Sequence, residues 1–405
     1  MDCIEVALEE NFSVRIARNQ LKKKKNNVTL APFLPTVSAF ARQTQTNNHS
    51  YLEYADESKA KIESRTGDYR GGMTFSWRLF DGLAMFSSYA KLQELQTSGE
   101  LSFRSDVEMM VMQLSNQYYQ IITLQNQVEL VQQLVDISRL RYEQALLKYN
   151  IGTISGLECQ QARTYFNADS SSLIVQKQNL RNAYIGFYRT IGIPYDSKIV
   201  VRDTIVPETE LVLDNLWASA LEKNTELLWM RQGKVIAGHD LTIARAGRYP
   251  TLDFTSGYSV SGVNTPLSTS ARYNETNGYN WGFSLSIPIF SGFTINRQIK
   301  NAKLGVARSE LQYQQREQSL LGDLLQEYEV YTDNLRMIHF ETQNAQVAYS
   351  NVDAAMERYR LGSFSLIEFR DIQLSYLNAV DRKLRAIYQA KLSEVALLLL
   401  AGVIF

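Results

Sequence analysis

An internal duplication constrains the fold of this chain more than any other sequence feature. The segment GMTFSWRLFDG at residues 72–82 recurs as GFSLSIPIFSG at residues 282–292, an offset of 210 positions. Because a repeated sequence pattern implies a repeated supersecondary structure, the chain is predicted to consist of two copies of one unit. Further matched pairs, in chain order, are Ala7-Leu8 and Asn11 with Ala220-Leu221 and Asn224, Tyr149 and Gly152 with Tyr359 and Gly362, and Gly192 with Gly402.

Each copy contains one very long predicted helix, over residues 81–148 and 292–358. Neither range contains a proline, and apolar residues recur every seven positions. That spacing is typical of the buried seam of a coiled coil. At 1.5 Å per residue, a helix of about 68 residues extends for about 100 Å. The row is Val107, Leu114, Ile121, Val128, Val135, Tyr142 and Tyr149 in the first copy, and Leu324, Tyr331, Ile338, Ala345, Val352 and Tyr359 in the second.

Each long helix is preceded by a predicted pair of strands. Apolar and polar residues alternate there with the period of two that a strand with one apolar face requires. The polar stretches 47–70 and 263–280 are predicted to be exposed loops. The strands are expected at about residues 35–46, 71–80, 250–261 and 281–290, and the residues expected to face the membrane are Met73, Phe75, Trp77, Leu79, Phe283, Leu285, Ile287 and Ile289.

The apolar strand face needs a cover, and the helices already use their apolar stripes in the coiled-coil seam. Lipid is therefore the predicted cover, and the aromatic residues near the strand ends suit a membrane interface. Since closed membrane barrels start near eight strands, four strands per chain predict an oligomer, and three chains would supply twelve strands. An antiparallel sheet packed on a helix is the alternative.

The complete prediction is a mainly α chain with a small β-barrel part. The first repeat covers residues 1–192 and has its tight turn at 149–155. Residues 193–212 form a linker. The second repeat covers residues 213–405 and has its turn at 359–365. In both repeats the expected order is helix, strand pair, long helix, tight turn and return helix.

With these motifs the whole chain resembles the TolC family of outer-membrane efflux proteins. The motifs are the Ala-Leu-x-x-Asn helix openings, the strand starts Leu34-Pro35 and Tyr249-Pro250, the Phe-x-Gly ends at Gly82 and Gly292, and the Tyr-x-x-Gly turns. The resemblance implies a homotrimer in which a twelve-stranded β-barrel continues into a long periplasmic α-helical coiled-coil barrel. It further implies a passive exit duct of a tripartite efflux or type I secretion system in the bacterial outer membrane.

The resemblance also implies partners and site residues. The partners are outer-membrane lipid, a periplasmic adaptor protein and an inner-membrane pump of the RND, ABC or MFS type. The sequence does not distinguish between drugs, metals and proteins as the exported substrate. The gate would pair Tyr359 with Glu158 and use Glu368 and Asp371 as an acidic ring, while Phe364 replaces a basic gate residue and predicts a hydrophobic constriction. The residues expected to contact the adaptor are Tyr149, Gly152, Thr153, Ser155, Tyr359, Gly362, Ser363 and Ser365.

Other classes of function find little support in the sequence. The 42 basic and 42 acidic residues balance, whereas a nucleic-acid-binding protein needs a basic excess. Neither Cys3 nor Cys159 belongs to a metal or disulfide motif, and no nucleophile–base motif is present, so no enzyme activity, metal or cofactor is expected. No signal peptide precedes the first helix. A soluble coiled-coil scaffold without membrane contact is the alternative function.

Overall fold

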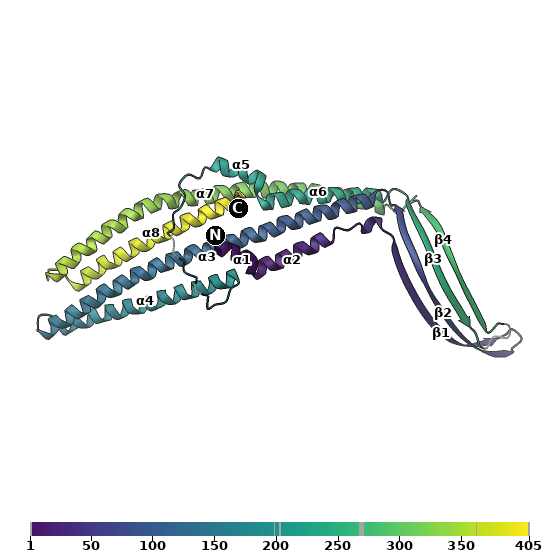
Figure 1. Cartoon of the computed structure of the whole chain (residues 1–405), viewed down its shortest axis with the longest axis horizontal. Coiled ribbons are helices and arrows are strands. Elements are labelled where there is room, and N and C mark those ends of the chain that lie inside the picture. Colours follow the sequence, from purple (N-terminus) through teal and green to yellow (C-terminus); the bar gives the residue numbers. More distant parts are fainter. Residues whose placement is uncertain (1, 198, 202–203, 267–270, 362, 404–405) are drawn as a thin grey trace. The chain divides into compact units, whose positions relative to one another are not determined.

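The structure is a computed structural model that describes residues 2–197, 199–201, 204–266, 271–361 and 363–403. Short helices, a strand pair, a long helix and a return helix follow one another twice along the chain (Figure 1). The elements are α1 (Asp2–Glu10), α2 (Phe12–Asn26), the 3-10 turn η1 (Ala31–Phe33), β1 (Thr36–Glu53), β2 (Lys59–Phe80), α3 (Ala84–Asn150), α4 (Gly156–Ile191), α5 (Leu213–Lys223), α6 (Thr225–Ala246), β3 (Thr251–Asn264), β4 (Tyr273–Ser286), α7 (Thr294–Arg360) and α8 (Leu366–Leu400).

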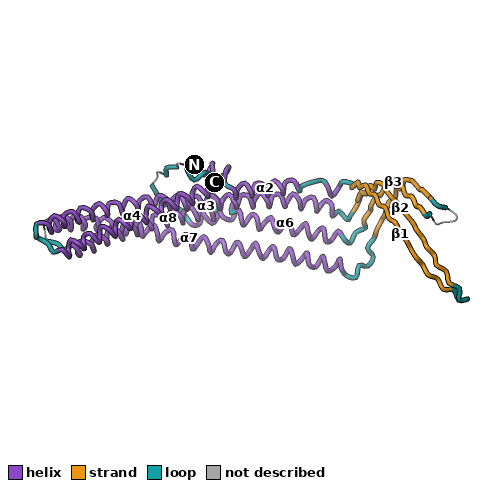
Figure 2. The backbone as a smooth tube through the Cα atoms, turned by 90° about the horizontal axis from the view of Figure 1, so that it is seen from below, coloured by secondary structure: helices purple, strands orange, loops and turns teal. Residues whose placement is uncertain are grey.

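The chain divides into two compact units, and each unit takes segments from both halves of the sequence. The helical unit contains residues 1–23, 98–231 and 311–405, and the sheet unit contains residues 24–97 and 232–310. In the helical unit α3 and α4 form one antiparallel hairpin, and α7 and α8 form the other (Figure 2). Among the described helices, none carries an apolar stretch long enough to span a membrane.

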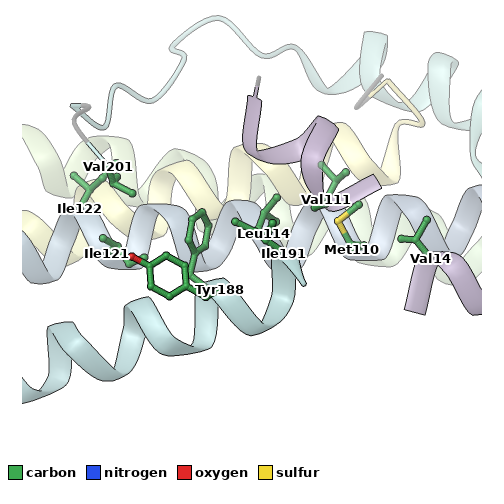
Figure 3. Packing of buried hydrophobic residues seen from close by; sticks show 11 residues of the cluster. Val14, Met110, Val111, Leu114, Ile121, Ile122, Tyr188, Ile191 and Val201 are labelled. Atoms are coloured by element: carbon green, nitrogen blue, oxygen red, sulfur yellow. The ribbon is translucent and has the colours of Figure 1, made fainter. Parts of the chain in front are cut away.

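The core of the helical unit follows the heptad rows. Leu114 and Ile121 of α3 are buried against Phe187 and Ile191 of α4, and Val14 of α2 joins the same cluster (Figure 3). In the second hairpin Leu324 and Tyr331 of α7 are almost fully buried beside Leu397 of α8. Each such side chain contributes about 1.5–3 kcal/mol by leaving water. The seven-residue spacing therefore predicted core positions of both long helices, except for Tyr149, the last residue of the first row, which is 49% exposed.

The duplicated Ala-Leu-x-x-Asn motif builds the same junction twice. The Oδ1 atom of Asn11 accepts the N–H of Val14 at 3.0 Å and caps α2, while its amide nitrogen donates to the carbonyl of Thr190 near the end of α4. Asn224 caps α6 through Leu227 at 2.9 Å and donates to Leu400 of α8 at 3.0 Å. One side chain thus joins the start of one helix to the end of another.

A glycine completes each of these junctions. Gly192 and Gly402 have φ values of 91° and 71°, and a Cβ atom would lie 2.6 Å from the Glu10 carbonyl oxygen in the first case and 2.5 Å from that of Lys223 in the second. Both the left-handed backbone and the close approach exclude a larger residue. The two copies of the repeated sequence therefore make the same contacts at their helix junctions.

The sheet unit contains one antiparallel sheet with strand order β1-β2-β3-β4. Because paired residues share a face, the register separates the side chains into an apolar face and a polar face. The apolar face carries Val37, Ala39, Met73, Phe75, Trp77, Leu252, Phe254, Tyr258, Tyr279, Trp281, Phe283 and Leu285. The polar face carries one aromatic residue, Phe40, together with Thr36, Ser38, Thr74, Ser76, Arg78, Asp253, Thr255, Asn280 and Ser284.

Contacts within each face match its chemistry. On the apolar face the ring of Phe254 lies 5.0 Å from that of Phe283 and 5.9 Å from that of Phe75. On the polar face Arg78 donates to Asp253 at 2.9 Å. Aromatic residues of the apolar face stay exposed in the chain, with 65% of Trp281 accessible to solvent. The sheet therefore has a large apolar surface that the described residues of its own chain leave uncovered.

The structure corrects the predicted extent of the strands. Residues 47–70 were expected to be a loop, yet β1 runs to Glu53 and β2 begins at Lys59. Polar cross-strand pairs continue the ladder there, including Lys59 with Glu53 at 3.2 Å. Hydrophobic alternation cannot reveal such a segment, because both of its faces are polar.

The fourth strand is shifted in the same way. It was expected at residues 281–290, but β4 spans Tyr273–Ser286, so residues 273–280 of the expected loop also belong to a strand. Ile287 and Ile289 follow its end, since Pro288 has no N–H for a ladder. Leu79 has no partner in the β2–β3 ladder, where the register shifts between Arg78 and Phe80.

The junction asparagines give a test of this packing. Changing Asn11 or Asn224 to alanine removes a helix cap and leaves the carbonyl of the neighbouring helix end without its donor. We expect each change to lower the free energy of unfolding by about 1–2 kcal/mol, measured by urea titration followed by circular dichroism. The control Asn351→Ala, on an exposed position of α7, should change it by less than about 0.5 kcal/mol. Equal stability of all three variants would contradict the role of the junctions.

Candidate functional site at the helical tips

The turns that join α3 to α4 and α7 to α8 close in the same way. Gly152 has a φ of 79°, which lets the chain reverse after α3. Thr153 then donates from both its backbone nitrogen and its hydroxyl to the Lys148 carbonyl, each at 2.9 Å. Ser363 makes the same two bonds to Arg358 at 3.1 Å. The predicted tip residue Gly362 lies outside the described residues.

A serine starts each return helix. Ser155 and Ser365 accept the backbone N–H of the residue three positions later, each at 3.2 Å. In the second hairpin Glu368 returns the bond, accepting the Ser365 backbone N–H at 3.0 Å and its hydroxyl at 2.8 Å. This reciprocal capping box lowers the pKa of Glu368, first through the hydroxyl and then through the backbone. Glu368, predicted as part of an acidic ring, therefore also caps α8.

Three of the five predicted gate residues lie around one cavity, and the other two, Glu368 and Asp371, are not among the residues that line it. Tyr359, Glu158 and Phe364 all line a space of about 820 Å³ between the two tips. Tyr359 is buried, with its ring 5.9 Å from that of Phe369, whereas Glu158 is exposed. Burial raises the pKa of Tyr359, and nearby Arg141 opposes that rise. No hydrogen bond joins Tyr359 to Glu158 in the described part of the chain, and Asp371 is exposed on α8.

Arg141 of α3, which the sequence reasoning missed, is a central residue of this region. Only 2% of it is exposed, and its guanidinium lies 4.3 Å from the ring centre of Phe369. It donates to the side-chain oxygen of Gln373 at 3.0 Å and to the Leu366 carbonyl at 3.3 Å. Burial lowers its pKa to about 10, so the group stays charged at neutral pH. These contacts join α3 to α8.

A largely buried ion pair joins α8 to α4. Arg370 of α8 donates to both carboxylate oxygens of Asp169 of α4, each at 2.8 Å. Ser138 of α3 donates to the same carboxylate. Arg370 also reaches the Gln373 oxygen at 3.4 Å, which connects this pair to Arg141. The five polar side chains Ser138, Arg141, Asp169, Arg370 and Gln373 are called the clasp below.

A sequence signal for part of the clasp does exist. Ser138 occupies the seam position that Val131 and Ala145 hold one heptad before and after it. Gln373 likewise interrupts a run of apolar residues spaced three or four apart on α8, between Phe369 and Tyr376. A polar residue in an apolar seam needs a buried partner. Arg141 gives no such signal, because an arginine beside the seam reads as a solvated side chain.

Comparison with known proteins identifies the family. Residues 3–193 and 216–403 match the family described as outer membrane efflux protein. The chain therefore belongs to the outer membrane efflux protein family.

Its relatives include the outer membrane protein TolC of Escherichia coli, with 20% identity over 92% of this chain and 75% of the relative. The probable outer membrane lipoprotein SilC of Salmonella typhimurium is 22% identical over 98% of this chain and 84% of its own length. Among solved structures, the Campylobacter jejuni CmeC outer membrane channel has a TM-score of 0.79 at 16% identity, covering 100% of this chain and 85% of its own. The twofold order of helices and strands is therefore the fold of this family.

The capping box predicts a pH effect at the start of α8. Since bonding lowers the pKa of Glu368, its stabilising effect is complete above the ordinary glutamate pKa of about 4.3 and is lost as pH falls through the lowered value. We expect amide hydrogen exchange in residues 366–369, corrected for intrinsic rates, to speed up in acid. Ser365→Ala removes the hydroxyl but keeps the backbone N–H that Glu368 accepts, so it should reduce this acid dependence.

The matched control is Ser155→Ala, where the structure has the serine cap without the returning glutamate bond. That change should speed amide hydrogen exchange at the start of α4 by the same factor at every pH. Acid-independent exchange at residues 366–369 in the wild-type protein would contradict the role of Glu368.

Proposed function

We propose that the chain is one protomer of a homotrimeric exit duct in the bacterial outer membrane, serving a tripartite efflux or type I secretion system. The single observation that carries the proposal is the sheet, which has one apolar face, one polar face and two edges without a partner in the described chain. Family membership gives the same localisation and a channel function. No catalytic step is part of the proposal.

The size of the apolar face suits an outer membrane. Its rows extend on β3 from Leu252 to Val260. At about 3.3 Å per residue and a strand tilt of about 40°, those rows span about 20 Å of membrane, close to the apolar band of about 25 Å in outer-membrane barrels. Lipid would then cover Met73, Trp281 and Phe283, and the polar face would line a wet lumen.

Three copies would pair the open edges of the sheet and cover exposed apolar surface of the helices. If β1 of one copy pairs with β4 of the next, twelve strands close without an edge. The helical unit has unused apolar surface as well, because Leu325, Met337 and Phe340 of α7 are exposed in the single chain. A neighbouring copy packed along α7 would bury that surface. Trimerisation is therefore supported by two separate features of the molecule.

The tips are the proposed contact with a periplasmic adaptor. Apolar residues at both turns are exposed, with 75% of Ile151 and 82% of Leu361 accessible to solvent. Tyr149, Thr153, Ser155 and Ser363 surround them. An inner-membrane pump of the RND, ABC or MFS type would supply the energy, since a passive duct has no energy source of its own. The pump also selects the drug, metal or protein substrate.

One relative is named for the compound that it exports, the pyoverdine export outer membrane protein OpmQ of Pseudomonas aeruginosa. A wet lumen lined by the hydroxyl-bearing polar face would discriminate little between substrates, which would leave their selection to the pump.

The proposed gate lies at the tips and involves Tyr359, Glu158 and Phe364 around the cavity, with Glu368 and Asp371 contributed by each copy near the axis. Crowded carboxylates repel one another and attract cations. Phe364 packs with Tyr359 in one apolar cluster, which supports a hydrophobic constriction at that position.

Single-channel recording in planar bilayers tests the duct and its gate. The wild-type protein should form channels of low conductance, and the double variant Tyr359→Phe with Glu158→Gln should raise that conductance severalfold by loosening the tips. The control pair Tyr195→Phe with Glu143→Gln, both exposed and away from the cavity, should match the wild type. An unchanged double variant would remove these residues from the gate.

The soluble-scaffold alternative gives the opposite result in a simple fractionation. Such a scaffold would stay in solution as a monomer without detergent and form no channels. The duct would fractionate with the outer membrane and need detergent to remain a trimer.

A further inference from the structure

One cross-strand row on the polar face of the sheet consists of side chains that can all donate hydrogen bonds. Arg42 of β1 lies directly opposite Arg70 of β2. Ser261 of β3 pairs with Arg70, and Thr276 of β4 pairs with Ser261. The row therefore crosses all four strands, which lie side by side in Figure 1, with two guanidinium groups and two hydroxyls. These four residues are called the arginine row below.

The two arginines of this row are not neutralised by ion pairs. Like charges directly opposite each other in an antiparallel ladder repel. Both side chains are exposed, and neither forms an ion pair or a side-chain hydrogen bond with a described residue. Asp68 lies on the same face in the next row, opposite Thr44. Since one carboxylate offsets one of two cations, each chain keeps a net positive charge at this level.

The rest of the polar face adds no unpaired charge. Among its paired positions the other charged residues are Arg78 and Asp253, and these two form an ion pair at 2.9 Å. The rows between that pair and the arginine row contain hydroxyl and amide side chains, glycines and Phe40. The net positive charge of the polar face is therefore concentrated in the arginine row.

The arginine row lies just beyond one end of the apolar band. On β3 the band ends at Val260, and Ser261 is the next residue. Beside the row, on the apolar face, Tyr69 contacts the hydroxyl of Tyr273 and donates to Glu275 at 3.1 Å. Tyrosines are typical of the boundary between lipid and water. The arginines would thus lie level with the lipid headgroups, but on the opposite face of the sheet, which lines the lumen of the proposed duct.

We propose that the arginine row forms a ring that binds oxyanions at the outer mouth of the duct. The proposal rests on the duct function, because closure of three sheets brings three rows to one level. Three copies contribute six arginines and three copies of Asp68, so the ring keeps an excess of three positive charges. The proposal therefore adds a ligand class to the duct, solutes that carry phosphate, sulfate or carboxylate groups.

The chemistry of the row favours a multivalent anion. Each guanidinium presents its N–H groups as a planar fork that matches two oxygens of a phosphate, sulfate or carboxylate group. Hydroxyls of Ser261 and Thr276 extend the donors across the sheet. Salt screens single charges in a wet lumen over about 8–10 Å, so a solute with several anionic groups gains most from a ring of cations.

Calorimetric titration of the detergent-solubilised trimer with tripolyphosphate tests the ring. The wild-type protein should bind tripolyphosphate, and the double variant Arg42→Gln with Arg70→Gln should bind it at least about tenfold more weakly, because it loses the charged donors. That variant also removes a pair of like charges from the ladder, so its trimer should form at least as readily as that of the wild type. Trimer content is measured first for each variant.

A matched control separates the ring from a general effect of charge. Lys61→Gln with Arg65→Gln removes two positive charges from exposed positions of β2 on the opposite face of the sheet, and should bind as the wild type. Phosphatidic acid added to the micelles tests a lipid headgroup as the source of the phosphate. It should not compete with tripolyphosphate, because lipid reaches only the outside of the barrel.

The outcomes distinguish the ring from the duct. Weaker binding in the arginine variant alone, without competition by phosphatidic acid, supports the ring. A channel-forming wild-type trimer that binds no tripolyphosphate would overturn the ring alone. Equal affinities of the wild type and the arginine variant, an equal loss in the control pair, or competition by the lipid would do the same. A wild-type protein that is monomeric in detergent and forms no channels in planar bilayers would contradict the duct function, and the ring with it.

Discussion

Two strand edges without a backbone partner in the described chain, at β1 and β4, constrain how copies of this chain can assemble. Each edge presents N–H and C=O groups that cost several kcal/mol apiece if they are left unpaired in a membrane. Pairing β1 of one copy with β4 of the next satisfies both edges and separates an apolar outside from a polar inside. The register already sorts the side chains into these two faces.

The helical unit combines an apolar core with a polar cluster near the tips. Far from the turns, Leu324 and Tyr331 bury apolar surface in the coiled-coil seam, and Asn11 and Asn224 fix the helix junctions. Near the turns the seam becomes polar, and Arg141 donates to Gln373 and to the Leu366 carbonyl there. Buried polar groups specify an arrangement more than they stabilise it. Apolar contacts therefore hold the hairpins together far from the turns, and polar contacts do so near the turns.

Sequence periodicity predicted the parts of the structure in which one chemical signal dominates. The heptad rows placed Ile121 and Leu324 in the core, and the duplicated asparagine motif marked both junctions. The polar end of the β1–β2 hairpin was missed because neither face there is apolar. Arg141 was missed because its burial depends on α8, more than 200 residues away in the chain. The gate roles of Tyr359 and Glu158 and the assignment of lipid-facing residues stay predictions.

The most direct test of the account is an electron cryomicroscopy structure of the protein extracted in detergent. The account predicts three chains, twelve strands in one closed barrel, β1 of each chain hydrogen-bonded to β4 of the next, and Met73, Trp281 and Phe283 facing the detergent. A single chain whose own helices cover the apolar face, or a barrel with its polar face outward, would contradict it.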